Sequence, residues 1–141
     1  MRLTADNLSR QLAERLLPVY LVSGDEPLLA AEALDAIRAR ARALGFEERE
    51  RLFIDKTAAA WEHALGAARN RSLFANRRIL ELRLVSGKPG SGAAALLKLI
   101  AAAGDELLLI IITGKLERDT ASAEWVRAVQ QRGAWLTLWP P

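Results

Sequence analysis

An uninterrupted apolar run from Leu107 to Ile112 is the feature that most constrains the fold. Successive side chains of a strand point to opposite faces of its sheet, so a strand that is apolar at every position must be covered on both faces. This is the environment of a central strand in a parallel sheet with helices on either side. The run is far too short to cross a membrane, so it predicts a buried strand.

Strand-like and helix-like segments alternate through the rest of the chain. Further strands are expected at Val19–Val22, Leu52–Ile54, Ile79–Val85 and Ala134–Trp139. Helices are expected at Thr4–Leu17, from an Asp25 cap to a stop at Gly45, and at Ala58–Arg69, Ala93–Ala103 and Ala121–Gln131. This alternation predicts an α/β fold: a five-stranded parallel sheet with right-handed crossovers and helices on both faces.

The length of 141 residues suits a single domain with a sizeable core. The chain has no cysteine, which excludes disulfides and thiolate metal sites. No apolar segment of the secretory type follows Met1, and we expect a cytoplasmic protein without a membrane contact. Pro140 and Pro141 follow the last expected strand directly, which leads us to expect a fragment of a longer protein.

A short basic segment joins the third expected helix to the third expected strand. It places Leu73 beside Phe74, with Arg71 before the pair and Arg77 and Arg78 after it. Adjacent residues on a helix point about 100° apart, so the pair cannot share one buried stripe. Either the two side chains close the core at this junction, or they form a hydrophobic plug that enters a pocket on another protein.

Positive charge is concentrated around this segment. The whole chain carries a net charge of +3, yet the stretch from Arg69 to Lys98 holds seven basic residues and one acidic residue, Glu81, for a net +6. A basic face of this kind would suit a nucleic acid or an acidic protein surface. A solvated loop without a partner explains the charges equally well.

The first strand-to-helix turn is where a doubly wound fold would bind phosphate. A phosphate loop needs glycines for accessible amides, then Lys and Ser or Thr for charge and magnesium. The turn from Ser23 to Leu29 contains a single glycine. Its Pro27 removes an amide donor, and Asp25 and Glu26 would repel phosphate. We therefore expect neither nucleotide hydrolysis nor a cofactor.

Other candidate chemistry is sparse. His63 is the only histidine, so a metal site is not expected and the residue is assigned to a helix surface. The basic, glycine-rich stretch from Lys88 to Gly92 is interpreted as a surface loop rather than a phosphate contact. Core packing, rather than base stacking, is expected of the four tryptophans, which are Trp61, Trp125, Trp135 and Trp139.

Four segments carry a resemblance to a known family: Val19–Leu29, Ala43–Glu48, Ser72–Ala75 and Leu107–Leu116. In order and spacing they cover nearly the whole chain. Together with the altered phosphate turn, they resemble the N-terminal domain of the delta subunit of bacterial DNA polymerase III, a clamp-loader subunit. Each segment alone is weakly specific, and the resemblance rests on the set.

The resemblance implies a fold of the P-loop AAA+ type with a degenerate nucleotide site, in one domain over residues 1–141. It implies a non-catalytic domain that binds the beta sliding clamp and helps to open the ring for loading onto DNA during replication. Leu73 and Phe74 would be the plug, flanked by Ser72, Arg71, Arg77 and Arg78. Arg71 stands where related sequences often carry an apolar residue, so no role beyond the basic surround is assigned to it.

The resemblance also implies further partners and leaves alternatives. The other clamp-loader subunits, gamma/tau and delta prime, would assemble through a C-terminal region outside this sequence, and contact with DNA would be indirect or weak. A second hypothesis is a nucleic-acid-binding domain with salt-dependent affinity. A third is a P-loop-like NTPase, which the turn at Gly24 disfavours. The second hypothesis would use the residues Arg69, Arg71, Arg77, Arg78 and Lys88.

Overall fold

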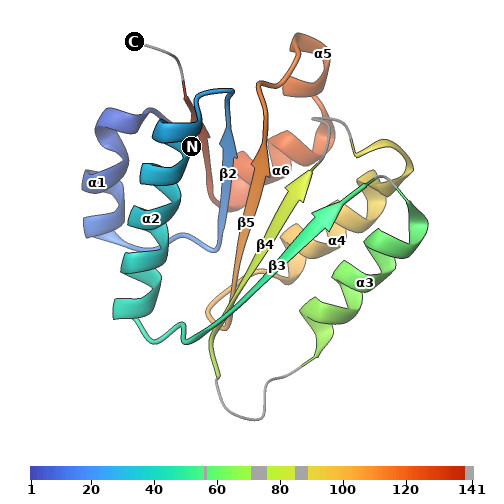
Figure 1. The fold of residues 1–141 in the computed structure, drawn as a ribbon, viewed down its shortest axis with the longest axis horizontal. Coiled ribbons are helices and arrows are strands. Elements are labelled where there is room, and N and C mark those ends of the chain that lie inside the picture. Colours follow the sequence, from blue (N-terminus) through green and yellow to red (C-terminus); the bar gives the residue numbers. More distant parts are fainter. Residues whose placement is uncertain (56, 71–75, 85–88, 139–141) are drawn as a thin grey trace.

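The computed structural model describes residues 1–55, 57–70, 76–84 and 89–138. In these ranges a six-stranded sheet, parallel throughout, lies between two layers of helices (Figure 1). The strands are β1 (Arg2–Leu3), β2 (Val19–Ser23), β3 (Glu48–Ile54), β4 (Arg78–Leu84), β5 (Leu107–Thr113) and β6 (Ala134–Thr137). Their order in the sheet is β1–β6–β2–β5–β4–β3.

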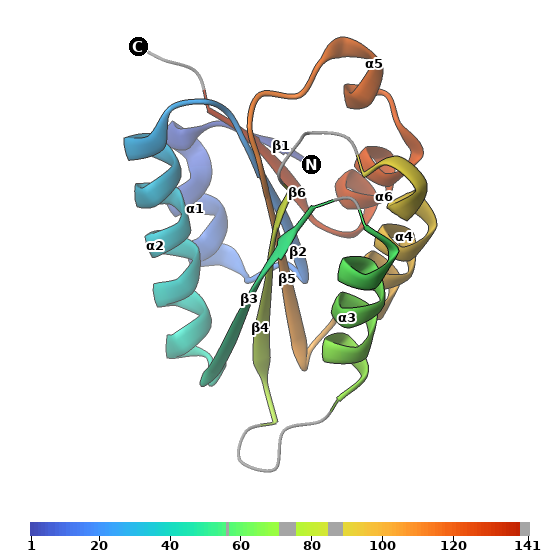
Figure 2. The same cartoon turned by 45° about the vertical axis from the view of Figure 1, so that its right-hand side comes forward.

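The helices divide between the two faces of the sheet (Figure 2). On one face lie α1 (Ala5–Glu14) and α2 (Pro27–Ala43). On the other lie α3 (Ala58–Arg69), α4 (Ala93–Ala102) and α6 (Glu124–Arg132). A one-turn helix, α5 (Arg118–Ala121), lies beyond the end where the strands finish (Figure 1). We call that the carboxyl end of the sheet, and the opposite end, where the strands begin, its amino end.

The predicted α/β architecture with a parallel sheet is confirmed, but the predicted number of five strands is wrong. The sixth strand is β1, which pairs with β6 through Arg2 opposite Trp135 and Leu3 opposite Leu136. Two residues are too few to show the alternation by which strands are recognised in a sequence. A further hydrogen bond beside β1 supports this pairing: the Trp135 amide donates to the Met1 carbonyl at 2.8 Å.

Several element boundaries also differ from the prediction. The expected helix Thr4–Leu17 spans only Ala5–Glu14, and the expected strand Leu52–Ile54 begins at Glu48. The expected helix Ala121–Gln131 is two helices, because the backbone at Ala123 is extended (φ −65°, ψ 155°) between α5 and α6. The N-cap of α2 is Glu26 rather than Asp25, and Pro27 follows it in the first turn. In addition, the expected loop before α4 contains a single 3₁₀ turn, η1 (Gly90–Gly92).

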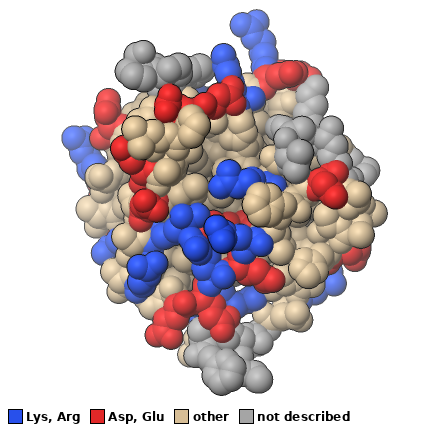
Figure 3. All heavy atoms as spheres, viewed as in Figure 1, with Lys and Arg blue, Asp and Glu red and all other residues tan. Residues whose placement is uncertain are grey.

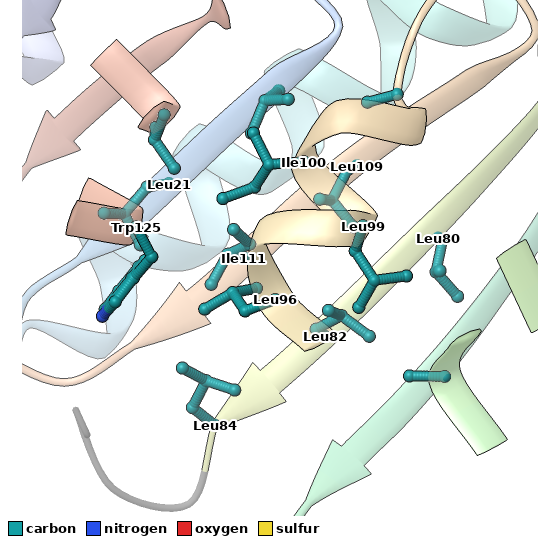
Figure 4. Close-up of a cluster of buried hydrophobic side chains, with 14 of the residues drawn as sticks. Leu21, Leu80, Leu82, Leu84, Leu96, Leu99, Ile100, Leu109, Ile111 and Trp125 are labelled. Atoms are coloured by element: carbon teal, nitrogen blue, oxygen red, sulfur yellow. The ribbon is translucent and has the colours of Figure 1, made fainter. Parts of the chain in front are cut away.

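The core consists of two apolar clusters, one on each face of the sheet. Every residue of β5 is buried, as predicted for its apolar run. Its Leu109 and Ile111 pack toward α3, α4 and α6, whereas Ile110 packs toward α1 and α2. Figure 4 shows part of the first cluster, where residues of α4 meet side chains of β4 and β5. The α4 residues labelled there are Leu96, Leu99 and Ile100.

The expected packing role of the tryptophans is confirmed for the three that the structure describes. Trp61, Trp125 and Trp135 are all buried in the cluster on the α3, α4 and α6 face. Trp139 lies outside the described residues. In the described part of the chain, no helix combines the length and the apolar character that a membrane span requires.

Candidate protein-interaction site

The junction of α3 and β4 lies at the amino end of the sheet, where the sequence places the Leu73–Phe74 pair. Helix α3 ends at Arg69, and the Asn70 amide donates to the Gly66 carbonyl at 3.0 Å. The Arg78 guanidinium, at the start of β4, donates to the carbonyl of Ala67 at 2.7 Å and to that of Ala68 at 2.8 Å. Arg78 therefore satisfies carbonyls that the last turn of a helix leaves without partners.

Arg77 anchors the other side of the same junction. Its guanidinium donates to the Leu44 carbonyl at the C-terminus of α2 and lies over the Phe46 ring, 5.9 Å from the centroid. The Arg78 backbone amide also donates to the Glu106 carbonyl, at 3.0 Å. Both arginines, predicted as a basic surround of the plug, thus hold the start of β4 against α2, α3 and the chain before β5.

The four residues that resemblance assigns to the centre of the site, Arg71, Ser72, Leu73 and Phe74, lie outside the described residues. Their role stays a prediction. The described chain stops at Asn70, one residue beyond α3, and resumes at Asn76, two residues before β4. Leu73 and Phe74 fall between these two described segments in the sequence.

Two open pockets flank this junction. One, of about 310 Å³, is lined by Glu48, Glu50, His63, Gly66, Ala67, Asn70 and Arg78. The other, of about 350 Å³, lies at the amino end on the α2 side and includes Leu44, Phe46 and Arg77 in its lining. His63 is exposed on α3, as predicted. The described residues hold no group of three or more His, Cys, Asp or Glu side chains that would bind a metal.

At the carboxyl end, the turn after β2 is packed against the chain that follows β6. Gly24 has a φ of +146°, and a Cβ atom on it would lie 2.6 Å from the Leu138 carbonyl oxygen. The Gly24 amide donates to the Thr113 carbonyl at 3.3 Å. This glycine is therefore needed for a close approach of two backbones, which is a different use from cradling a phosphate.

Two carboxylates of the chain, those of Asp25 and Glu26, lie at the N-terminus of α2. The Glu26 carboxylate accepts from the Leu28 amide at 3.3 Å. The Asp25 carboxylate accepts from the Lys115 amide at 3.0 Å, which ties the turn to the loop after β5. Because Pro27 has no amide hydrogen, the amide of Leu28 is the first donor after the proline, and Glu26 occupies it.

A pocket of about 770 Å³ lies beside this turn, and sequence reasoning did not anticipate it. Its lining includes Arg2, Ser23, Lys115 and Trp135. The Trp135 Nε1 atom donates to Ser23 Oγ at 2.8 Å, and the Arg2 guanidinium stacks 3.8 Å from the Trp135 ring centroid. The sequence contained no indication of this pocket, because Arg2 belongs to β1, a strand that is too short to be recognised from its pattern.

Comparison with known proteins gives the chain a family. A family model described as "DNA polymerase III, delta subunit" matches residues 20–138. The DNA polymerase III subunit delta of Escherichia coli strain K12 is 36% identical over 142 residues, a match that spans 100% of this chain and 41% of that protein. The Haemophilus influenzae protein of the same name is 28% identical over 130 residues, covering 92% of this chain and 38% of the relative.

The chain thus spans about two fifths of the length of the curated relatives it matches. Among solved structures, the DNA clamp loader delta protein (YqeN) of Bacillus subtilis has a TM-score of 0.70 at 13% identity, covering 94% of this chain and 42% of that one. The Aeropyrum pernix ORC1 protein in complex with DNA has a TM-score of 0.53 at 19% identity, covering 96% and 45%. These two likenesses concern the fold. On the match of the family model, which covers most of its residues, the chain belongs to the DNA polymerase III delta subunit family.

Proposed function

We propose that this chain is the part of a clamp-loader delta subunit that binds the beta sliding clamp of DNA polymerase III. The observation that carries the proposal is the α3–β4 junction, where Arg77 and Arg78, which follow the Leu–Phe pair in the sequence, are both anchored to helix carbonyls. Family membership supports the choice of partner. Leu73 and Phe74 would enter a hydrophobic pocket on the clamp.

Such a plug would supply a large share of the binding free energy of a complex. Burying a Leu or a Phe side chain contributes about 1.5–3 kcal/mol each. Two adjacent anchors of this kind can dominate a small interface, while the residues around them exclude water. Ser72 and Arg71 would lie at the rim of the interface together with Arg77 and Arg78, whose main contribution would be to fix the position of the plug.

The same junction disfavours the nucleic-acid alternative that relies on the basic segment. The guanidinium groups of Arg77 and Arg78 are directed to backbone carbonyls of α2 and α3. Releasing either group to a phosphate would leave those carbonyls without their partner, which costs free energy. Of the remaining residues of that alternative, Arg69 is exposed, whereas Arg71 and Lys88 lie outside the described residues.

Opening of the ring requires more than binding. A ligand shifts a conformational equilibrium only by its difference in affinity for the two states. We propose that the chain binds the clamp more tightly when the interface between clamp protomers is open, so that DNA can enter. A clamp variant that is monomeric should therefore bind more tightly than the closed ring, and equal affinities would overturn the ring-opening role while leaving clamp binding intact.

We further propose that the chain forms one AAA+-like domain that neither binds nor hydrolyses nucleotide, and that the whole protein assembles with gamma/tau and delta prime. The Glu26 carboxylate on the Leu28 amide supports the first part, because it occupies a donor that a phosphate would need. Thermal unfolding with and without millimolar ATP and magnesium tests it. An unchanged melting temperature is expected, and a rise that grows with ATP concentration would contradict it.

Calorimetric titration into the cognate sliding clamp is the decisive test of the plug. We expect the parent chain to bind and the Leu73→Ala/Phe74→Ala variant to lose about 3–6 kcal/mol of binding free energy. That corresponds to a rise in Kd of at least about 100-fold. The melting temperature of the variant should be unchanged if the pair is not part of the core.

A matched control removes the same two side-chain types elsewhere. Leu28 and Phe53 are exposed to 65% and 69%, and neither belongs to the α3–β4 junction. The Leu28→Ala/Phe53→Ala variant should bind the clamp like the parent. Equal weakening by both double variants, or no binding by a well-folded parent, would refute the plug.

A further inference from the structure

One part of the sheet is left open to solvent on the face that α1 and α2 cover elsewhere. These helices lie over the part of the sheet that contains β2, β5 and β6 and cover Ile79 and Glu81 of β4, whereas β3 and the carboxyl end of β4 have no helix over them on this face (Figure 1). The consequence is visible in β3, the last strand of the sheet order. Its Arg49 and Arg51 are exposed, and Phe53 is exposed to 69%.

The pairing register shows that these side chains share one face. Arg51 lies opposite Glu81 of β4, and Phe53 lies opposite Arg83. Glu81 faces α2, because its carboxylate accepts from Arg38 of that helix. Side chains alternate along a strand, so Arg49, Arg51 and Phe53 point to this face together. Leu52, which precedes Phe53, and Ile54, which follows it, pack in the cluster on the opposite face.

We call the group formed by Arg49, Arg51, Phe53 and Arg83 the patch. Its positive charge exceeds what the neighbouring acids Glu81 and Asp35 can balance, because both also lie beside Arg38. Glu81 is 1% exposed and accepts two hydrogen bonds from Arg38, at 2.7 Å and 2.6 Å, while Arg49 lies 3.7 Å away. Arg51 and Arg83 form no ion pair with any residue that the structure describes. Figure 3 shows Lys and Arg side chains gathered in the middle of this face, beside α2.

The residue types in the patch limit the classes of partner that it could bind. An apolar protein surface does not suit it, because Phe53 lies opposite Arg83 and follows Arg51 on the same face of β3. Pairing of a further strand with β3 is disfavoured by the alternating charges of Glu48, Arg49, Glu50 and Arg51, which is how proteins protect sheet edges. An exposed aromatic ring among arginines on an open sheet face is instead suited to stack on a base while the arginines meet neighbouring phosphates.

We infer that the open face of β3 and β4 binds single-stranded nucleic acid, with Phe53 stacking on a base and Arg51 and Arg83 contacting phosphates on either side. A duplex does not fit equally well, because its base faces are covered by stacking. This site is distinct from the Leu73–Phe74 segment and does not depend on it. Glu81 holds Arg49 in place within the patch and is itself held by two hydrogen bonds from Arg38.

Fluorescence anisotropy with a labelled oligo-dT strand of about 20 nucleotides at low salt tests the inference. Binding should weaken as salt rises, and each phosphate contact on a single strand contributes about 0.7 to the slope of log affinity against log salt concentration. Arg51→Ser/Arg83→Ser should lower that slope by about 1.4. Phe53→Ala should weaken binding by about tenfold, the usual size of one stacking contact, with the slope unchanged.

A matched control has the same net charge. Arg10 and Arg127 are exposed on α1 and α6, away from the patch, so Arg10→Ser/Arg127→Ser should bind the strand nearly as the parent does. The Leu73→Ala/Phe74→Ala variant should also bind it normally, which separates this inference from clamp binding. All variants are compared at an unchanged melting temperature.

Three outcomes would overturn the inference. The first is an absence of oligo-dT binding by the folded parent, and the second is a Phe53→Ala variant that binds as the parent does. The third is tighter binding of a labelled polyglutamate peptide than of oligo-dT, with the same dependence on Arg51 and Arg83. That last result would assign the patch to an acidic protein surface.

Discussion

Glu81 is a carboxylate placed where sequence patterns would not put one, within a strand covered by neighbours on both sides. Its charge is compensated by Arg38, 43 residues earlier in the chain. The hydrogen bonds raise the pKa of Arg38 above its ordinary value. Sequence analysis noted Glu81 only as the lone acid of a basic stretch, because a contact between distant residues leaves no local pattern.

Replacing Glu81 by Ala should destabilise the fold by about 2–4 kcal/mol, since Arg38 would lose its buried partner and keep only the exposed Asp35 at 3.6 Å. Urea denaturation of the variant measures this. Glu50→Ala is the matched control, because Glu50 is an exposed acid on the neighbouring strand β3. Similar effects of the two substitutions would contradict a special role for the buried pair.

Tyr20 is a buried residue whose ionisation should affect stability at high pH. Burial raises the pKa of its phenol above the ordinary value near 10, against the lowering effect of hydrogen bonds from the Leu17 amide and to Gln11. The neutral phenol is therefore favoured in the folded state. As pH rises past 10, the unfolded chain ionises first, so the free energy of unfolding should fall.

Tyr20→Phe should lose about 1–3 kcal/mol at pH 7, because Gln11 and the Leu17 amide remain buried without their partner. The variant should lack the part of the alkaline loss of stability that belongs to the phenol. Tyr20 is the only tyrosine, so ultraviolet titration of the parent reads its pKa directly. A titration midpoint at or below 10 would contradict the burial argument.

At the scale of elements, strand and helix patterns with a strong period were predictable and short or bent elements were not. The α3 range Ala58–Arg69 was predicted to the residue, and the apolar run of β5 gave the centre of the sheet. β1 has only two residues, and α5 has four, so neither repeats a pattern. The N-cap of α2 was predicted at Asp25, one residue before the observed Glu26, because either acid could cap the helix.

The candidate site could be predicted only in part for a related reason. Sequence reasoning selected Arg77 and Arg78 as charged neighbours of a plug. Their contacts with carbonyls of Leu44, Ala67 and Ala68 depend on how α2 and α3 end, which only the tertiary structure supplies. Leu73 and Phe74 stay a prediction, because they lie outside the described residues.

The contacts of Arg78 can be separated from a direct role at the interface. Arg78→Met should cost about 1–2 kcal/mol of stability, because the carbonyls of Ala67 and Ala68 lose a charge-assisted partner. It should weaken clamp binding less than Leu73→Ala/Phe74→Ala does. Arg69→Met is the control on the exposed last turn of α3, and chemical denaturation with calorimetry reports both effects. Loss of binding without loss of stability would make Arg78 a direct contact.

At the scale of the whole molecule, one sheet separates two cores that should nevertheless unfold together. The described tryptophans Trp61, Trp125 and Trp135 all report on the core of the α3, α4 and α6 face. Ile110 is fully buried in the opposite core. If the two cores unfold as a single cooperative unit, a substitution in one core must shift the unfolding transition that is measured in the other.

Ile110→Ala should destabilise the chain by about 2–5 kcal/mol, the usual cost of such a cavity. Its urea midpoint should fall equally by tryptophan fluorescence and by far-ultraviolet circular dichroism. Leu109→Ala, its neighbour in the other core, provides the comparison. A circular dichroism transition that precedes the fluorescence transition would show that the two faces unfold separately.

The order of the strands also has a consequence for synthesis on the ribosome. β5 lies between β2 and β4, and β6 lies between β1 and β2, so the last strands to be made fill the middle of the sheet. A nascent chain that ends at Glu106 can pair β3 with β4, but β1 and β2 have no common neighbour. Both β2 and β4 then present unpaired edges that are prone to association with other chains. Completion of the sheet should therefore wait until β5 and β6 have both emerged from the exit tunnel.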